Sequence, residues 1–289
     1  MTDQAKIGII GGSGLYEMRN IADVREARVS TPFGAPSDAV VLGTLRGVRC
    51  AFLPRHGRGH VLLPSEINGR ANIWALKSLG VERVIAIGAV GSLKESIAPR
   101  DFVFPDQLVD ETKGRRSTFF GDGVVGHVAF AHPFCDAMSA VLADAAEGLG
   151  LKCHRGGVYC CMEGPAFSTK AESAMHRMLG YSVIGMTAVP EIRLAREAEI
   201  CYSLAALITD YDCWKEGEEV SADAVVEHLA ANTANAQALL EKAVAELAGL
   251  PRRCPCARAL DGAVFTRPEA RDRAALKRLE LILGRHVAA

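Results

Sequence analysis

Two acidic side chains stand two residues apart at the end of a long apolar segment, at Asp210 and Asp212. In an extended strand, residues two apart point to the same side, so both carboxylates are expected on one face. Neighbouring carboxylates repel each other, and this repulsion raises the pKa of one of them. A carboxylic acid that keeps its proton can donate it to a heteroaromatic leaving group. A solvated acidic turn is the competing interpretation.

A second cluster packs two arginines and two histidines into the segment from Pro54 to His60, directly after an apolar run. The planar guanidinium of Arg55 matches the oxygens of a phosphate, and His56 can add another hydrogen bond. The segment therefore predicts an oxyanion site at the C-terminal end of a strand. A plain solvated basic loop is the alternative.

Small residues follow two further apolar strands, at Gly11 to Gly14 around Ser13, and at Gly88 to Gly91 around Ala89. Glycines let the backbone N–H groups approach an anion closely, and the hydroxyl of Ser13 can assist. Each turn alone also fits simple close packing. Three such turns after three strands predict a pocket at the carboxyl edge of a sheet.

Two other segments connect a strand to a helix and carry side chains suited to a nucleoside-like ligand. Phe167 can stack on a planar ring, Met186 offers an apolar wall, and Thr187 offers a hydroxyl to phosphate. Taken alone, Phe167 and Met186 also fit a role in the core.

The elements that must position these residues alternate between short apolar runs and longer helical patterns, which predicts an α/β fold. A Pro-, Cys- and Arg-rich connector follows, so we expect one main domain over residues 1–250 and a C-terminal connector and helix over 251–289, packed on that domain. The expected strands are 7–10, 39–42, 51–54, 84–87, 102–104, 158–162, 183–186 and 202–209, and the expected helices are 65–79, 133–149, 169–179, 190–198, 222–248 and 267–283.

Composition narrows the class of partner. The 289 residues include 33 basic and 34 acidic side chains, a net charge of -1, with no basic stripe for nucleic acid or a membrane surface. The polar start resembles no signal peptide, and no apolar run reaches the ~20 residues of a membrane span. A cytoplasmic protein that binds a small molecule is expected.

The nine cysteines form no disulfide framework. Cys254 and Cys256 flank a proline near the C-terminus, and reduced thiols are favoured there over a disulfide. Zinc is not expected, because the pair has neither a CxxC spacing nor neighbouring histidines.

Taken in order, the segments GIIGGSGLY, RHGRGH, NIWALK, AVGSL, EGPAFSTKAES, MTAVPE and TDYDCWKE resemble the methylthioadenosine phosphorylases of the trimeric purine nucleoside phosphorylase family, over residues 7 to about 245. The resemblance implies a central mixed, twisted β-sheet, partly barrel-like and flanked by helices. It implies phosphorolysis of S-methyl-5′-thioadenosine to adenine and 5-methylthioribose 1-phosphate.

The resemblance also implies a role for each matching residue. Phosphate, a co-substrate, would be bound by Ser13, Arg55, His56, Ala89 and Thr187. The nucleoside would be bound by Phe167 at the purine, Met186 under the ribose, Asp210 and Asp212 at N7 and the 6-amino group, and His127. No metal or other cofactor is implied.

His127 matches a residue that, in the family, reaches the 5′ substituent in a neighbouring subunit. The resemblance therefore implies a homotrimer or homohexamer with active sites at subunit interfaces.

Two positions depart from the family pattern. Gly88 stands where many relatives have a hydroxyl residue, so anion binding there depends on backbone N–H groups. Ala222 stands where a bulkier residue is common, so adenosine or 5′-deoxyadenosine could also fit.

Several other activities remain open on sequence grounds. A 6-oxopurine or methylthioinosine phosphorylase would keep the fold, although a carboxylate pair favours a 6-amino over a 6-oxo purine. A nucleosidase would use water and would leave the arginine and histidines without a purpose. A protein that senses nucleosides without converting them is the non-enzymatic alternative.

Overall fold

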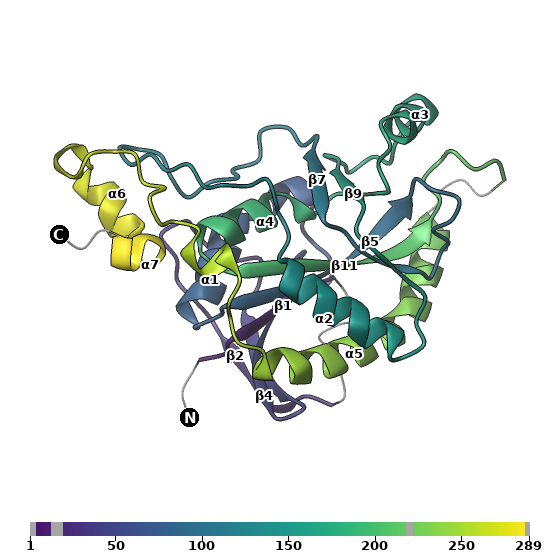
Figure 1. The fold of residues 1–289 in the computed structure, drawn as a ribbon, viewed down its shortest axis with the longest axis horizontal. Helices are drawn as coiled ribbons and strands as arrows, with labels where there is room; N and C mark the ends of the chain where they lie inside the picture. The colour runs from purple at the N-terminus through teal and green to yellow at the C-terminus, as the bar shows by residue number, and fades with distance from the viewer. Residues whose placement is uncertain (1–3, 13–19, 218–221, 287–289) are drawn as a thin grey trace.

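The computed structural model describes residues 4–12, 20–217 and 222–286, and it confirms an α/β fold built on a mixed sheet (Figure 1). Strands run in the order β2-β3-β4-β1-β5-β10-β9-β7, while β11 pairs with β5 and β6, and β8 pairs with β6. The sheet does not close into a barrel. The strands are β1 (Ile7–Gly11), β2 (Ala22–Ala27), β3 (Val40–Leu45), β4 (Val48–Pro54), β5 (Arg83–Ser92), β6 (Phe102–Phe104), β7 (Gln107–Asp110), β8 (Cys153–Arg155), β9 (Val158–Cys161), β10 (Val183–Gly185) and β11 (Cys201–Asp210).

Helices cover both faces of the sheet. Along β5, Val84 and Ala86 pack with α1 and α4, whereas Ile85 and Ile87 pack with α2 and α5. Strand residues alternate between faces, so one strand supplies two hydrophobic cores. Figure 1 shows α2 and α5 together below the central strands. The helices are α1 (Gly69–Ser78), α2 (Asp136–Glu147), α3 (Lys170–Met178), α4 (Ala188–Glu197), α5 (Ala222–Gly249), α6 (Arg273–Arg278) and α7 (Glu280–Leu283).

Parallel pairing at the centre determines where the functional segments lie. β1 is parallel to both β4 and β5, and β11 is parallel to β5. The carboxyl ends of parallel strands meet at one edge of a sheet. β5 continues beyond this edge, where its last residues pair with β10 in the antiparallel sense. The long strand β5 thus runs alongside both functional segments. Its residue Ile87 accepts a hydrogen bond from Arg55 in the turn after β4, and its residue Gly91 pairs with Asp210 at the end of β11.

Every strand expected from sequence is present, but three further strands and one broken helix were not expected. β2, β7 and β8 lack an apolar pattern: β2, for example, is exposed along most of its length. The expected helix 267–283 is instead the 3-10 turn Pro268–Ala270 followed by α6 and α7. The capping side chain of Asp272 accepts a hydrogen bond from the N–H of Ala275 and starts a new helix there.

The C-terminal segment packs on the rest of the chain. Leu260, Leu279 and Leu283 are buried in the same core as the α1 and α4 residues, and Arg285 pairs with Glu199 at 3.0 Å. The division at residue 250 stays an interpretation. Among the described residues, no helix combines the length and apolar character needed to cross a bilayer.

Candidate functional site

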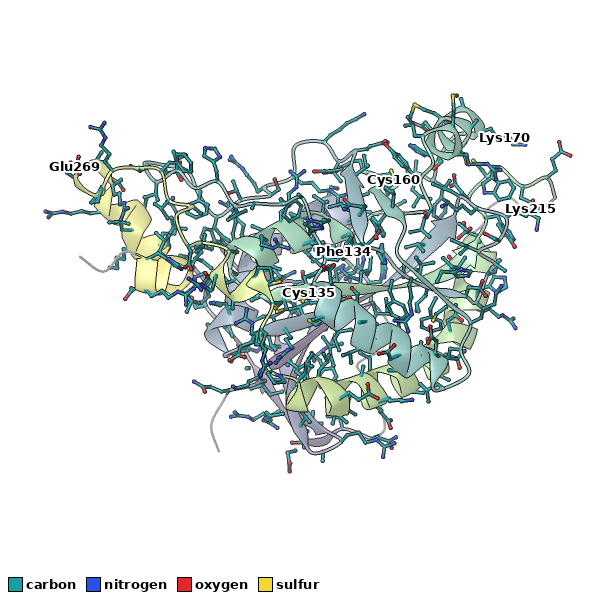
Figure 2. The ribbon with its side chains drawn as sticks, in the orientation of Figure 1. Phe134, Cys135, Cys160, Lys170, Lys215 and Glu269 are labelled. Atoms are coloured by element: carbon teal, nitrogen blue, oxygen red, sulfur yellow. The ribbon has the colours of Figure 1, made fainter. Side chains whose placement is uncertain are left out.

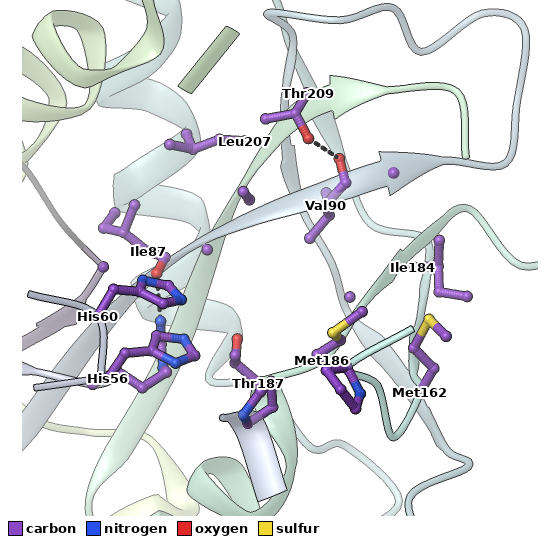
Figure 3. A pocket seen from close by; sticks show the side chains of 18 of the residues that line it. His56, His60, Ile87, Val90, Met162, Ile184, Met186, Thr187, Leu207 and Thr209 are labelled. Carbon is purple, nitrogen blue, oxygen red and sulfur yellow. Dashed lines mark hydrogen bonds between the residues drawn. The ribbon is translucent and has the colours of Figure 1, made fainter. Parts of the chain in front are cut away.

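One cavity of about 380 Å³ lies at the carboxyl edge of the central strands (Figure 3). This volume is in the range of small-molecule sites. All six segments singled out from sequence contribute to its wall. The contributors are Gly12, Arg55, His56, Gly88, Ala89, Phe167, Met186, Thr187, Asp210 and Asp212. The structure therefore brings the predicted anion-binding residues and the acid pair together in one space.

Arg55 is buried and held by a carboxylate that the sequence analysis did not assign. Its Nε and Nη2 donate to the two carboxylate oxygens of Glu191 at 2.5 and 3.1 Å, and its Nη1 donates to the carbonyl of Ile87 at 2.8 Å. Burial alone lowers the pKa of Arg55, but the Glu191 carboxylate more than offsets it, so the pKa is raised.

Arginine has five N–H donors, so these three bonds leave two for a ligand. Glu191, which also accepts from the hydroxyl of Tyr202 at 3.0 Å, neutralises the charge of Arg55. Arg55 is thus an oriented hydrogen-bond donor, and its positive charge is already compensated.

His56 is neutral and its tautomer is fixed by its partner. Its Nδ1 lies 2.8 Å from the carbonyl of Leu62, an acceptor, so the proton of the neutral ring is on Nδ1 and Nε2 is left as an acceptor. Burial lowers the pKa of His56 to about 4. The ring stacks on His60 with centroids 4.2 Å apart, as Figure 3 shows. A neutral His56 can accept a hydrogen bond from the O–H of a hydrogen phosphate.

Thr187 and the β5 turn complete this end of the cavity. Thr187 precedes α4 at the N-cap position, and its side chain makes no capping hydrogen bond. A Cβ on Gly88 would lie 3.5 Å from the Thr187 Oγ1, which shows how closely the two segments approach. Ala89 follows on the cavity side of β5. These positions agree with the predicted anion site, while their roles remain predictions.

The acid pair lies at the other end of the cavity, but strand alternation does not explain it. β11 ends at Asp210, and Asp212 lies in a turn with φ of +54°. The backbone N–H of Asp212 donates to the Asp210 Oδ1 at 2.7 Å. The expected strand geometry was therefore wrong, and it is this turn that brings both acids to the cavity.

The pKa of Asp210 is raised, as expected, but the main cause is burial, and repulsion from Asp212 contributes less. The Thr209 hydroxyl lies 2.7 Å from the Asp210 Oδ2 and 3.3 Å from the carbonyl of Val90. It can donate to Asp210 when the acid is ionised. When Asp210 is protonated, it can accept from Asp210 and donate to Val90. The hydroxyl thus accommodates both protonation states of the acid.

One carboxylate oxygen of Asp212 is buried and accepts no hydrogen bond from the described residues. The residue is 3% exposed, and the oxygen without a hydrogen-bond partner among the described residues is Oδ2. A buried carboxylate oxygen without a donor costs free energy, so such a group inside a cavity points to a ligand. A donor such as an exocyclic amine would satisfy it.

An apolar wall lies between the two polar ends. Figure 3 shows Met162, Ile184 and Met186 grouped on one side, and Phe167 also lines the cavity. Gly164 is required here, because its φ is +71° and a Cβ would lie 2.5 Å from the Met186 sulfur. Such a wall suits the faces of a sugar and a planar ring.

His127 lies apart from the cavity of its own chain. It is exposed, its backbone N–H donates to the carbonyl of Ala263 at 2.9 Å, and its ring contacts Phe265 edge-on. Ser13 and the side chain of Ala222 fall outside what the structure describes. The predictions for these three residues therefore stay predictions.

Sequence reasoning missed several residues of the site. Glu191 was present in the MTAVPE segment, and a buried arginine calls for an acid, so a search for the partner of Arg55 could have found it. Met162 and the loop residues Val61 and Leu62 carry no signal beyond ordinary apolar character. Only the folded chain shows that they face the cavity.

Comparison with known proteins places the chain in a defined group. Residues 6–245 match the Phosphorylase superfamily. An S-methyl-5′-thioadenosine phosphorylase of Geobacter sulfurreducens is 55% identical over 283 residues, which cover 97% of this chain and 99% of the relative. The crystal structure of a methylthioadenosine phosphorylase from an antarctic soil metagenomic library has a TM-score of 0.94 at 47% identity, and covers 97% of this chain and 99% of its own. A methylthioadenosine phosphorylase of Schistosoma mansoni, in complex with adenine, has a TM-score of 0.85 at 37% identity, with 93% and 99% covered.

Proposed function

The chain belongs to the phosphorylase superfamily, and from this premise we propose that it is a methylthioadenosine phosphorylase. The reaction splits 5′-methylthioadenosine with inorganic phosphate into adenine and 5-methylthioribose 1-phosphate. The observation that carries the proposal is the single cavity that joins Arg55, His56 and Thr187 to the buried acids Asp210 and Asp212. The family is the one that the sequence motifs predicted.

The anion end of the cavity orients the nucleophile. Arg55 offers two N–H donors, Thr187 a hydroxyl, and neutral His56 accepts from the phosphate O–H. A phosphate oxygen then attacks C1′ of the ribose while the bond from C1′ to N9 of adenine breaks. Fixed donors that need no rearrangement lower the barrier by orientation and electrostatics. The reaction needs no cofactor beyond the co-substrate phosphate.

The acid end of the cavity stabilises adenine as the leaving group. Electron density flows into the purine, and Asp210, whose pKa is raised by burial, gives its proton to N7. The free Oδ2 of Asp212 accepts from the 6-amino group. A 6-oxo group would place an oxygen against this oxygen, so the pair favours 6-amino purines.

We further propose that the chain acts as a homotrimer or homohexamer in the cytoplasm. Val61 and Phe167 line the cavity and yet are 71% and 46% exposed. Large apolar groups exposed at a cavity mouth are suited to a covering subunit, and His127 lies on a surface from which it could reach a neighbour. The nine cysteines are free, which fits a reducing compartment.

Release of free base, measured with and without phosphate, tests the activity. We expect rapid release of adenine from 5′-methylthioadenosine only when phosphate is present, with slower release from adenosine and 5′-deoxyadenosine. Release without phosphate would identify a nucleosidase. Faster turnover of methylthioinosine or inosine would identify a 6-oxopurine enzyme. Binding without turnover would identify a sensor.

Mixing of subunits tests the interfacial site. Chains with His127→Ala and chains with Asp210→Asn should each have low activity. After partial unfolding and joint refolding, some sites combine an intact Asp210 with the partner's intact residue 127. Activity should then rise above that of either variant refolded alone. An unchanged sum of the two activities would contradict a shared site.

A further inference from the structure

Four cysteines from distant parts of the sequence converge at one point outside the cavity. Cys135, Cys201, Cys254 and Cys256 each place their Sγ atom within 4.8 Å of the other three. The Cys201 and Cys254 sulfurs are 3.2 Å apart. Cys135, Cys201 and Cys256 are at most 3% exposed. None of the four is among the residues that line the cavity.

Three structural elements deliver these sulfurs. Cys135 occupies the N-cap position of α2, and its backbone N–H donates to the carbonyl of Tyr202 at 2.9 Å, which links the start of the helix to β11. Cys201 is the first residue of β11. Cys254 and Cys256 belong to the connector that follows α5 and begin a 3-10 turn. Figure 2 shows Cys135 at the start of α2, near the middle of the molecule.

We propose that Cys135, Cys201, Cys254 and Cys256 bind one zinc ion as a closed, structural site. Zinc bound by four thiolates is tetrahedral with Zn–S distances of about 2.3 Å, so the sulfurs are about 3.8 Å apart. The sulfurs already lie within 4.8 Å of one another, and one pair is 3.2 Å apart, so small shifts reach this geometry, inward for the longer distances and outward for the Cys201–Cys254 pair. Thiolate ligands select zinc over hard cations such as magnesium.

Convergence of all four sulfurs distinguishes a metal site from two disulfides. Two disulfides require two short pairs and place no constraint on the distances between the pairs. A single metal requires all six distances to be short, and this is observed. The CxC pair also suits shared ligation, because closing a disulfide over so short a loop restricts the unfolded chain little.

The surroundings partly offset the negative charge of four thiolates around a divalent ion. The Arg252 Nε donates to the Cys201 sulfur at 3.4 Å. The N-terminus of α2, a helix of 12 residues, faces Cys135 and favours negative charge. Zinc here would fasten the connector and the segment behind it to α2 and β11. The sequence analysis did not expect zinc, because the CxC pair has neither a CxxC spacing nor neighbouring histidines. Cys135 and Cys201, which complete the cluster, lie far away in the sequence.

Metal content tests the site directly. The chain is purified under reducing conditions without chelator, and zinc is measured by elemental analysis. We expect about one zinc per chain. After chelator treatment, addition of Co²⁺ to the reduced protein should produce thiolate-to-cobalt charge-transfer and tetrahedral d–d absorption bands. If the folded wild-type chain contained no zinc and showed none of these bands with cobalt, the proposal would be overturned. Two disulfides among these four cysteines, found by mass spectrometry in protein alkylated directly on cell lysis, before any reductant is added, would also overturn it.

Matched variants locate the ligands. The double variant Cys254→Ser, Cys256→Ser should lose zinc and the cobalt spectrum, and chelator should no longer lower its melting temperature. Cys153→Ser, which removes a half-buried cysteine outside the cluster, should keep about one zinc and the chelator effect. Retention of zinc by the double variant would overturn the assignment. These readouts are independent of activity, and the cobalt spectrum of the wild-type chain decides the question even if the double variant fails to fold.

Discussion

The backbone N–H of Asp212 donates to the Oδ1 of Asp210 at 2.7 Å, so the second acid orients the first through its main chain. The side chain of Asp212 remains available, because its buried Oδ2 has no partner among the described residues. One turn therefore separates two tasks. Asp210 can exchange a proton, whereas Asp212 can accept a hydrogen bond from a ligand.

Replacement of Asp210 by Asn should remove the proton donor and preserve the shape of the site. We expect kcat to fall by ~10² to 10⁴, which is the usual contribution of a general acid, with little change in the KM for phosphate. Steady-state kinetics with 5′-methylthioadenosine measure both. Asp144→Asn, at an exposed residue paired with Arg155, is the control. An unchanged kcat in Asp210→Asn would rule out the acid role.

Replacement of Asp212 by Asn should alter the choice of base. An amide can donate to a 6-oxo group, so kcat/KM for methylthioinosine should rise relative to that for methylthioadenosine. A site that leaves a buried polar group unpaired discriminates by a factor on the order of 10⁴, so the ratio should move by at least about tenfold. Competition between the two nucleosides measures it. An unchanged ratio of the two kcat/KM values would show that Asp212 does not recognise the base.

Loss of the Glu191 carboxylate should destabilise the fold and weaken phosphate binding. Glu191→Gln leaves the buried guanidinium of Arg55 without its counter-ion, which costs about 3 kcal/mol in comparable pairs. Urea unfolding measures the stability, and the KM for phosphate should rise. Glu26→Gln breaks the half-exposed pair with Arg58 and should cost under about 1 kcal/mol. Equal effects of the two variants would contradict the role of Glu191.

Two glycines on β5 should respond differently to added atoms. A Cβ at Gly88 makes only ordinary contacts, the nearest at 3.5 Å from Thr187. Gly88→Ser should lower the KM for phosphate by about tenfold, since a hydrogen bond to a charged group contributes ~1.5 kcal/mol. Gly88→Ala should change the KM for phosphate little.

A Cβ at Gly91 would lie 2.8 Å from the Asp210 Oδ1, so Gly91→Ala should displace the acid and lower kcat by roughly tenfold or more. Identical kinetics for the two alanine variants would contradict this contrast.

His56 should make folding sensitive to mild acid. Its pKa is about 4 in the folded chain and near 6.5 when unfolded, so the unfolded state binds more protons between these values. The contribution to stability is complete above about pH 6.5 and is lost as the pH falls toward 4, with about 2 kcal/mol lost between pH 7 and pH 5. Urea unfolding should show a smaller loss for His56→Gln than for the wild type. His132→Gln, at an exposed residue, should follow the wild type. Parallel curves for all three chains would show that His56 is not the group responsible.

Sequence predicted the central strands and the walls of the cavity because both have local signals. Apolar runs mark β1, β4, β5 and β11, and glycine or charged clusters follow them. Residues that act through long-range contacts gave no such signal. Glu191 lies 136 positions from Arg55, and the four converging cysteines come from three separate segments. The exposed strand β2 was missed for a related reason, since it pairs with β3 and only its last residue, Ala27, packs against a core.

The course of β5 has a further consequence. Gly88 stands beside Thr187, whereas Gly91 stands beside Asp210, so three residue steps along one extended strand, about 10 Å of chain, separate the anion end of the cavity from its acid end. The register of β5 against β11 shifts by one residue within this interval, between Ile208 and Asp210, so this irregularity places Asp210 opposite Gly91. Relatives that accept larger nucleosides should therefore differ at the rim, near Val61 and Phe167, and share the same interval along the floor.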